Sequence, residues 1–186
     1  MGKRLFIAVD IDETTRRQVG RIVADLRPGV EEQTKASWVP PDRMHLTLLF
    51  FGSADAALEE RIRGALAQPI RQAPFDLTFR GLGFFPERGS PRVLWLGIRD
   101  GLAELRRIQK TLEHAAGAPR EREGAFTPHL TLARFRDRLS RAKIAEITDI
   151  PASAGPSRID RVTLYESHLS PAGATYLPLA EALLPS

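Results

Sequence analysis

Met44-His-Leu-Thr-Leu-Leu-Phe-Phe51 and Pro128-His-Leu-Thr-Leu-Ala-Arg-Phe135 are two copies of one short sequence. Five of their eight aligned positions are identical, and the second copy follows the first by 84 residues. This spacing is too long for a solenoid repeat. The repeat therefore predicts a duplicated chain, with two similar lobes related by a pseudo-twofold axis.

Apolar patterns around the two copies predict a mixture of strands and helices. The run Leu5–Val9 is typical of a buried strand. Asp12 is a suitable N-cap for the next helix, which we expect Pro28 and Gly29 to end. We expect Gly52 to end the strand at 44–51. Further strands are expected at 75–79, 93–98 (the two joined as a hairpin), 128–135, 162–164 and 175–179, helices at 58–66, 105–115 and 144–147, and loops at 86–91 and 117–124.

The bulk composition is that of an ordinary globular chain. Of 186 residues, 42% are hydrophobic and 27% charged, so we expect a single domain over residues 1–186. A net charge of +4, mostly from arginine, favours a polyanionic partner such as nucleic acid. The lack of cysteine excludes disulfides, thiolate metal sites and cysteine nucleophiles. No apolar run has the length of a signal-peptide core or a membrane span, so we expect a cytoplasmic protein without a membrane partner.

The repeated tetrad His-Leu-Thr-Leu carries the chemistry. Side chains alternate between the two faces of a strand, so His45 and Thr47 share one face while the leucines share the other. The same alternation places His129 with Thr131. If the two lobes face each other, two imidazoles and two hydroxyls line one cleft.

Such a cleft suits phosphodiester chemistry near neutral pH. An unperturbed imidazole has a pKa of about 6.5, so one histidine can take a proton from water while the other gives one to a leaving oxygen. The threonine hydroxyls can donate hydrogen bonds to phosphate oxygens. Sequence periodicity does not tell the acid from the base.

Other interpretations of the motif are weaker. A lone strand histidine is more often a packing residue, but two of only four histidines occupy identical tetrads. Zinc needs three or four protein ligands, and the chain has neither cysteine nor a His-Glu-x-x-His pattern. We therefore expect no metal and no cofactor. No Gly-x-Ser-x-Gly elbow or Walker-type phosphate loop is present either.

The doubled motif resembles that of the 2H phosphoesterase superfamily, and its nearest branch is the RNA 2′,3′-cyclic phosphodiesterases, also called the 2′-5′ RNA ligase family. The segments Arg4-Leu-Phe-Ile-Ala-Val-Asp10, Val93-Leu-Trp-Leu-Gly97 and Thr163-Leu-Tyr-Glu-Ser167 are also typical of this family. The resemblance covers nearly the whole chain.

This resemblance implies a bilobal α+β fold, with two antiparallel sheets flanking a central cleft and helices packed outside. It implies metal-independent hydrolysis of RNA 2′,3′-cyclic phosphate ends to 2′-phosphate ends. His45 would protonate the leaving 3′ oxygen, and His129 would activate water. The partner would be an RNA 3′ end or a nucleotide with a cyclic phosphate, and we expect a monomer.

Three further residues are candidates for substrate contacts. Arg134 matches a family arginine that contacts phosphate, although its offset of five from His129 predicts the opposite face of a regular strand. Either the strand bends there or the side chain curls around its end, and the alternative is a surface salt bridge. Phe50 matches a position that can stack on a terminal base, with a core aromatic as the alternative. Tyr165 either reaches the cleft or packs in the core.

The remaining candidates are peripheral. We expect His114 and His168 to be surface or structural residues. A basic rim for RNA could include Arg80, Arg88, Arg92, Arg136, Arg138 and Arg141.

Three functional alternatives remain open. A 5′-hydroxyl in place of water would give 2′-5′ RNA ligation with the same residues. A phosphodiesterase for small cyclic nucleotides and a non-catalytic RNA-end-binding module are the other two.

Overall fold

The computed structural model describes residues 2–87, 89–117, 126–170 and 173–185. Within these ranges the strands form two antiparallel sheets accompanied by helices, which confirms the α+β class. The elements run in the order β1 (Lys3–Asp10), α1 (Glu13–Glu31), β2 (Ala36–Trp38), η1 (Pro41–Arg43), β3 (His45–Ala54), α2 (Ala56–Ala67), β4 (Phe75–Phe85), β5 (Val93–Asp100), α3 (Leu102–Ala116), β6 (Leu130–Phe135), α4 (Arg141–Thr148), β7 (Ser153–Ile159), β8 (Arg161–Ser170) and β9 (Gly173–Leu183).

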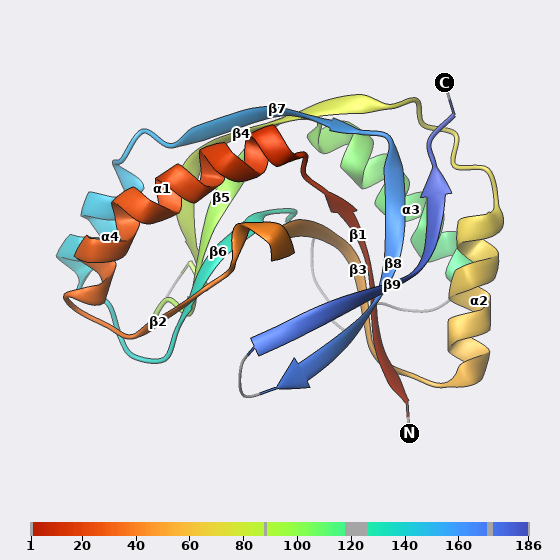
Figure 1. Cartoon of the computed structure of the whole chain (residues 1–186), viewed down its shortest axis with the longest axis horizontal. Coiled ribbons are helices and arrows are strands. Elements are labelled where there is room, and N and C mark those ends of the chain that lie inside the picture. The colour runs from red at the N-terminus through yellow and green to blue at the C-terminus, as the bar shows by residue number, and fades with distance from the viewer. Residues whose placement is uncertain (1, 88, 118–125, 171–172, 186) are drawn as a thin grey trace.

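The two sheets lie side by side with helices on their outer sides (Figure 1). The four-stranded sheet has the order β3-β1-β8-β9, and the five-stranded sheet has the order β2-β6-β5-β4-β7. Helices α1 and α4 contact the five-stranded sheet, whereas α3 contacts the four-stranded sheet and packs against α2. We call the face of each sheet that is turned away from its helices its inner face.

The element order contains two similar series. The series β1-α1-β3-α2-β4, in which β2 and η1 lie between α1 and β3, is followed by β5-α3-β6-α4-β7. In each series the motif strand pairs with the first strand, β3 with β1 and β6 with β5. The first helix of each series packs on the sheet of the other series, α1 on β7 and α3 on β3. This exchange joins the apolar side chains of both sheets into one contiguous core.

The two element ends that we expected at proline or glycine are wrong, and β6 begins at Leu130 rather than at residue 128. Helix α1 continues through Pro28 to Glu31, because Val30 in its last turn is fully buried and the Pro28 carbonyl accepts from the Glu32 amide. Strand β3 continues through Gly52, which has a φ of 65° that glycine adopts readily, at an irregularity in the pairing with β1.

The other sequence predictions divide into confirmed, missed and undescribed segments. The expected helices and the hairpin of β4 with β5 are present. The sequence patterns missed β2 and β7, which are short or interrupted by glycine and proline. Most of the loop expected at 117–124 lies outside the described residues. No described helix combines the length and the apolar character needed to cross a membrane.

Asp12 connects the start of α1 to β7. Its Oδ1 accepts from the Thr15 amide at 2.7 Å, and its Oδ2 accepts from the Arg158 amide at 3.3 Å. Its own amide donates to Ser157 Oγ at 2.8 Å. Burial opposes ionisation of this carboxyl, but the hydrogen bonds from Thr15, Arg158 and Ser157 outweigh it and hold the pKa of Asp12 below its ordinary value.

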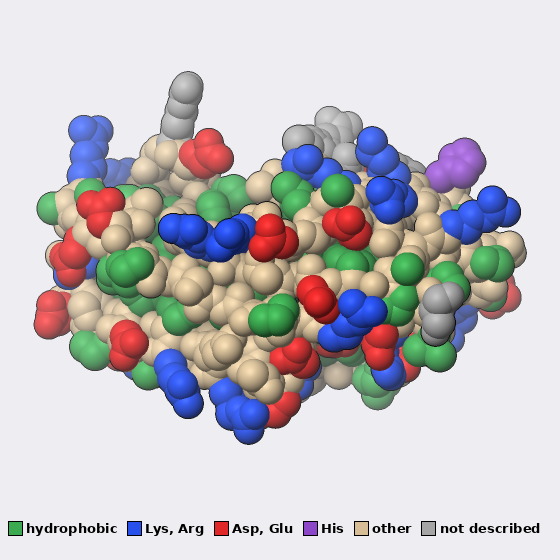
Figure 2. Space-filling view, turned by 90° about the horizontal axis from the view of Figure 1, so that it is seen from above, with side chains coloured by type: hydrophobic (Ala, Val, Ile, Leu, Met, Phe, Trp, Pro, Cys, Tyr) green, Lys and Arg blue, Asp and Glu red, His purple; other side chains and the backbone are tan. Residues whose placement is uncertain are grey.

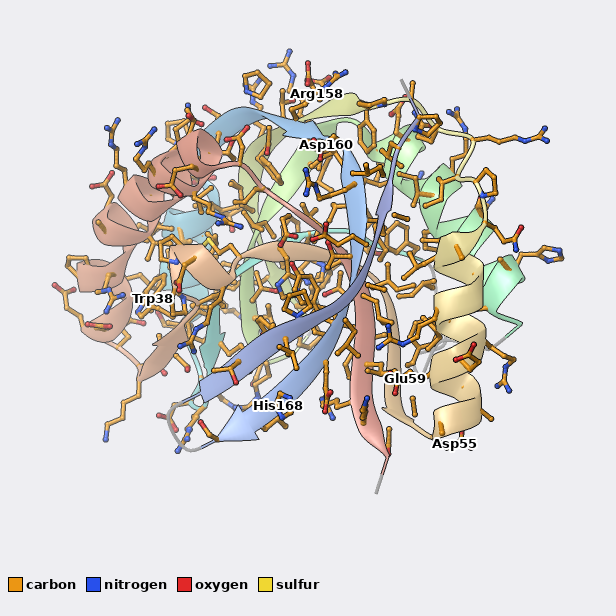
Figure 3. The ribbon with its side chains drawn as sticks, turned by 45° about the vertical axis from the view of Figure 1, so that its right-hand side comes forward. Trp38, Asp55, Glu59, Arg158, Asp160 and His168 are labelled. Carbon is orange, nitrogen blue, oxygen red and sulfur yellow. The ribbon has the colours of Figure 1, made fainter. Side chains whose placement is uncertain are left out.

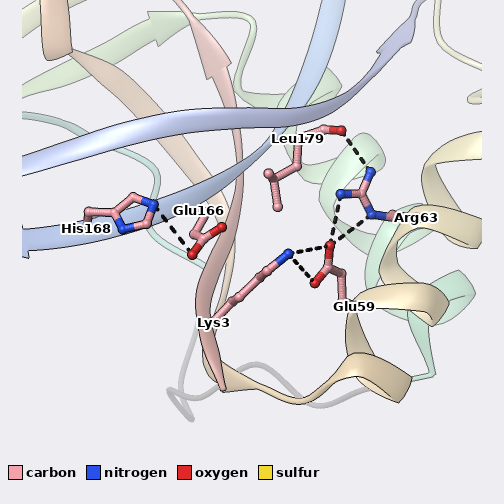
Figure 4. A network of polar contacts seen from close by, with 6 residues as sticks. All are labelled: Lys3, Glu59, Arg63, Glu166, His168 and Leu179. Carbon is pink, nitrogen blue, oxygen red and sulfur yellow. Dashed lines mark hydrogen bonds and ion pairs between the residues drawn. The ribbon is translucent and has the colours of Figure 1, made fainter. Parts of the chain in front are cut away.

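A second polar contact ties three elements together at the outer edge of the four-stranded sheet (Figure 4). Glu59 on α2 accepts from Lys3 on β1 and from Arg63, each at 2.9 Å. Arg63 also donates to the carbonyl of Leu179 on β9 at 2.8 Å. Lys3 therefore points to the helix side of its sheet, so its neighbour Arg4 lies on the inner face.

The two helix-capping aspartates offer a matched test of the Asp12 connection. Asp55 caps α2 by accepting from the Leu58 amide at 2.8 Å, and it lies at the lower end of that helix (Figure 3). We expect Asp55→Ala to lower the free energy of unfolding by about 1 kcal/mol. Asp12→Ala should cost about 2 kcal/mol, because it also loses contacts to β7. Urea denaturation measures both, and equal losses would contradict the proposed connection.

The lowered pKa of Asp12 predicts that the stability of the protein depends on pH. A carboxyl whose folded-state pKa is lowered contributes stability above its unfolded-state pKa and loses it as the pH falls through the folded-state value. The difference in the free energy of unfolding between the wild-type protein and Asp12→Asn should therefore become smaller below roughly pH 4.

Candidate active site

An extra residue in each motif strand sets which side chains reach the inner face. In β3, Ile7 pairs with Leu49 and Ala8 pairs with Thr47, so Leu48 is the extra residue. In β6, Leu94 pairs with Ala133 and Trp95 pairs with Thr131, so Leu132 is the extra residue. Both bulges fall three residues after the motif histidine. Each turns two successive residues toward the core, Leu48 with Leu49 and Leu132 with Ala133.

The bulges determine on which face of its sheet Phe50 and Arg134 lie, each five positions after a motif histidine. Beyond each bulge the alternation is inverted, so Phe50 joins the face of His45 and Thr47. Arg134 likewise joins the face of His129 and Thr131, and its side chain is exposed. The bend that the Arg134 hypothesis required is therefore present. All six candidate residues lie on the inner faces of the two sheets.

Both imidazoles are held in the same way. His45 Nδ1 lies 3.0 Å from the carbonyl oxygen of Arg43, and His129 Nδ1 lies 2.8 Å from that of Thr127. A carbonyl oxygen only accepts, so each Nδ1 donates its proton. In the neutral ring Nε2 is then the nitrogen that can accept a proton. Two rings in one tautomer, fixed by the carbonyl two residues earlier, are arranged for proton transfer through Nε2.

Aromatic rings restrict the orientation of His45. Its ring stacks on Phe6 at 4.9 Å and meets the edge of Tyr176 at 4.9 Å. Phe6 in turn stacks on Tyr165 at 5.3 Å. Because Phe6 is only 3% exposed, this wall is rigid on one side and leaves the imidazole little rotation.

A different aromatic wall supports His129. Its ring meets Phe85 edge to face at 4.9 Å and lies 6.4 Å from Trp95. The Trp95 ring lies over Gly83, where an added Cβ would approach it to 2.2 Å. Glycine at position 83 is therefore what lets the indole lie against the sheet beside His129.

A carboxylate and a phenol stand beside His45. Asp10 is the register partner of His45 on β1, and the Tyr165 hydroxyl donates to Asp10 Oδ2 at 2.7 Å. Burial and this carboxylate raise the pKa of Tyr165 far above its usual range, so the phenol stays neutral and remains a donor. Tyr165 thus shares the inner face with its strand partner Phe6.

The pKa of His45 is lowered by burial, its main cause. The Arg43 carbonyl and the Asp10 carboxylate act in the opposite direction, and the positive charge of Arg134 acts with burial. Arg134 belongs to the five-stranded sheet, and His45 to the four-stranded sheet. Strand β3 contacts β6 directly, and the charge of Arg134 acts on His45, so parts of the two motifs lie near each other.

The other candidates are peripheral. His114 and His168 are both exposed, and His168 lies 3.5 Å from Glu166 on the β8–β9 hairpin (Figure 4). In the expected arginine rim, Arg88 lies outside the described residues, and Arg92 donates to the carbonyl of Arg136. Figure 2 shows basic and acidic side chains interspersed on the face seen from above, rather than one basic patch.

Comparison with known proteins decides the family. The model of the 2′-5′ RNA ligase superfamily matches residues 13–171. The chain belongs to this superfamily. An RNA 2′,3′-cyclic phosphodiesterase of Thermotoga maritima is 33% identical over 96% of this chain and 94% of its own length. Its counterpart in Methanothermobacter thermautotrophicus is 34% identical over 95% and 96%.

Solved structures of the superfamily share the fold. E. coli LigT in its apo form aligns with a TM-score of 0.80 at 29% identity, over 100% of this chain and 99% of that one. LigT complexed with 3′-AMP aligns with a TM-score of 0.78 at 29% identity, with the same coverage. The superfamily fold thus extends over the whole chain.

The position of Asp10 predicts a measurable effect on His45. Because the carboxylate favours the imidazolium, Asp10→Asn should lower the pKa of His45 further. Titration of the imidazole signals by NMR measures this directly, without any substrate. Asp149→Asn, at the end of α4, is the control and should leave the His45 titration in place. An unchanged His45 titration in Asp10→Asn would show that Asp10 does not act on the ring.

Proposed function

We propose that this superfamily member hydrolyses RNA 2′,3′-cyclic phosphate ends to 2′-phosphate ends without a metal, with His45 and His129 as the acid–base pair. The observation that carries the proposal is the matched fixation of the two imidazoles. Each Nδ1 donates to the carbonyl two residues earlier, and each ring stands beside a threonine on an inner face. The relatives named RNA 2′,3′-cyclic phosphodiesterase support the same reaction.

The reaction needs one proton taken and one proton given. His129 Nε2 removes a proton from water as the oxygen attacks phosphorus. The His45 imidazolium gives its Nε2 proton to the 3′ oxygen as the P–O3′ bond breaks. The products are a 2′-phosphate and a 3′-hydroxyl, and the two rings end in exchanged protonation states.

One neighbour of His45 supports this assignment of roles. Burial lowers the pKa of His45, but Asp10 lies opposite it and favours the charged form that a proton donor requires.

Three further groups complete the phosphate site. The hydroxyls of Thr47 and Thr131 donate to the non-bridging oxygens, and Arg134 adds a positive charge. These groups stabilise the negative charge that develops on the non-bridging phosphate oxygens in the transition state. Phe50, on the same face as His45, stacks on the terminal base, which typically contributes about 1–3 kcal/mol.

We propose that the protein acts on RNA ends as a cytoplasmic monomer. The described surface exposes few large apolar side chains, Ile150, Leu169, Leu177 and Leu183, which suits a chain working alone. The relative LigT has been crystallised with 3′-AMP and with phosphate, which supports a site for nucleotides and phosphate groups.

Ligation is the second candidate, favoured by the family model that the chain matches. A 5′-hydroxyl would replace water and leave a 2′-5′ linkage, with His129 again as the base and His45 again as the acid. The concentration of water favours hydrolysis as the net direction.

A defined oligonucleotide with a 2′,3′-cyclic phosphate end tests the reaction. In excess chelator we expect a 2′-phosphate product, identified by its resistance to a 3′-specific phosphatase and by mass. A 3′-phosphate product, or inhibition by the chelator, would contradict the proposal. Tight binding without any product would instead favour an RNA-end-binding module, and turnover of small cyclic nucleotides alone would favour that class of phosphodiesterase.

Substitution of the histidines tests their roles. His45→Ala and His129→Ala should each reduce kcat/KM by roughly a hundredfold to ten-thousandfold, the usual size of a positioned proton transfer. The exposed His168→Ala is the matched control and should retain activity. Circular dichroism and thermal melting confirm that each variant is folded. Near-normal turnover by either motif variant would remove its histidine from the mechanism.

A further inference from the structure

Arg4 places a guanidinium on the inner face of the four-stranded sheet. Along β1 the side chains alternate, and Lys3 reaches Glu59 on the helix side. Arg4, Phe6 and Asp10 therefore share the opposite face, the one that carries His45. Arg4 is exposed, whereas Phe6 is buried under the aromatic wall of His45.

The guanidinium of Arg4 rests on Phe50. Its central carbon lies 4.7 Å from the centre of the Phe50 ring, within the range of a cation–π contact. This contact holds the guanidinium over the ring but uses none of its N–H groups. Phe50 reaches the inner face only because of the bulge at Leu48, so the same irregularity positions both residues.

In the described part of the chain, the Arg4 guanidinium forms neither an ion pair nor a hydrogen bond. There, no carboxylate lies within ion-pair distance of Arg4, and no oxygen accepts a hydrogen bond from it. Arg63 and Arg43 show the contrast, because Arg63 pairs with Glu59 and Arg43 donates to the Ala174 carbonyl. A positioned guanidinium whose donors remain available suits an anion, and phosphate oxygens match its geometry.

The ring on which Arg4 rests belongs to a backbone position well along β3 from the motif histidine. Phe50 is four ladder steps from His45 once the extra residue is discounted, roughly 13 Å along the strand. The phosphorus must lie beside the two motif histidines, so the terminal nucleotide occupies the space between them and Phe50. The next negative charge along an RNA chain is the phosphodiester on the 5′ side of that nucleotide.

We propose that Arg4, held on the ring of Phe50, binds the phosphodiester that joins the terminal nucleotide to the rest of the RNA. This subsite rests on the proposed function, and it narrows the substrate to an oligonucleotide rather than a cyclic mononucleotide. The two motif histidines act on the cyclic phosphate at the RNA end, while Arg4 binds the next phosphate along the chain.

Three substrates with the same terminal nucleotide test the subsite. They are a 2′,3′-cyclic mononucleotide, a dinucleotide with a 2′,3′-cyclic end, and that dinucleotide with a neutral methylphosphonate linkage. For the wild-type protein, kcat/KM should be higher for the charged dinucleotide than for the other two. Arg4→Gln should reduce the ratio of charged dinucleotide to mononucleotide about tenfold, the scale of one charge-assisted hydrogen bond.

Two comparisons identify the linkage as the partner of Arg4. The ratio of kcat/KM for the methylphosphonate dinucleotide to kcat/KM for the mononucleotide should be the same in the wild-type protein and in Arg4→Gln. For the charged dinucleotide, the slope of log kcat/KM against log salt should become shallower by about 0.7 in Arg4→Gln, as expected for one lost phosphate contact. Arg21→Gln, on an exposed position of α1, is the matched control and should keep the wild-type ratio.

The outcomes separate this subsite from the proposed function. Equal losses on all three substrates, or a loss that persists with the methylphosphonate, would show that Arg4 contacts the terminal nucleotide and would overturn the inference. If the wild-type protein turns over none of them, the proposed function fails. Calorimetric affinities for the corresponding 2′-phosphate products then give the same ratios without catalysis, and an unchanged ratio in Arg4→Gln would still reject the subsite.

Discussion

The extra residue three positions after each motif histidine is the constraint on which the site depends. A regular strand would turn Phe50 and Arg134 toward the helices, where a guanidinium would need a buried partner. By turning Leu48 with Leu49, and Leu132 with Ala133, into the core, the bulge adds apolar contact while it inverts the strand beyond it. The same local irregularity thus packs the core and places the two candidate substrate contacts, Phe50 and Arg134, on the inner faces.

The exchange of helices between the halves holds the two motifs against each other. Because α1 packs on β7 and α3 on β3, neither half has a core of its own, and the relative position of the sheets is set by the shared interior. A site assembled from both sheets needs this rigidity, since proton transfer depends on the distance of each imidazole from one phosphorus atom. Duplication without exchange would leave two lobes joined only by loops.

The sequence predicted what lies within one element and failed where distant elements meet. The tetrads singled out His45 and His129 as candidates, because a repeated polar pair is a local pattern. The role of Asp10 was not visible, since its partner Tyr165 is 155 positions away. The end of α1 was misplaced because burial of Val30 outweighs the local effect of Pro28. Strand β7 contains Gly155 and Pro156, and only its edge position in the sheet tolerates the proline.

Some residues of the proposed site occur in both halves of the chain and others in only one. This difference follows the symmetry of the substrate. A phosphorus atom with two non-bridging oxygens is nearly symmetric, and the proposed site meets it with equivalent pairs of histidines and threonines. The direction of the reaction and the nucleotide are not symmetric. They correspond to positions where the halves differ, such as Phe50 against Arg134. A duplicated fold can therefore keep the repeated histidines and threonines unchanged while a few positions diverge, and this fits the different roles that we propose for the two halves of the site.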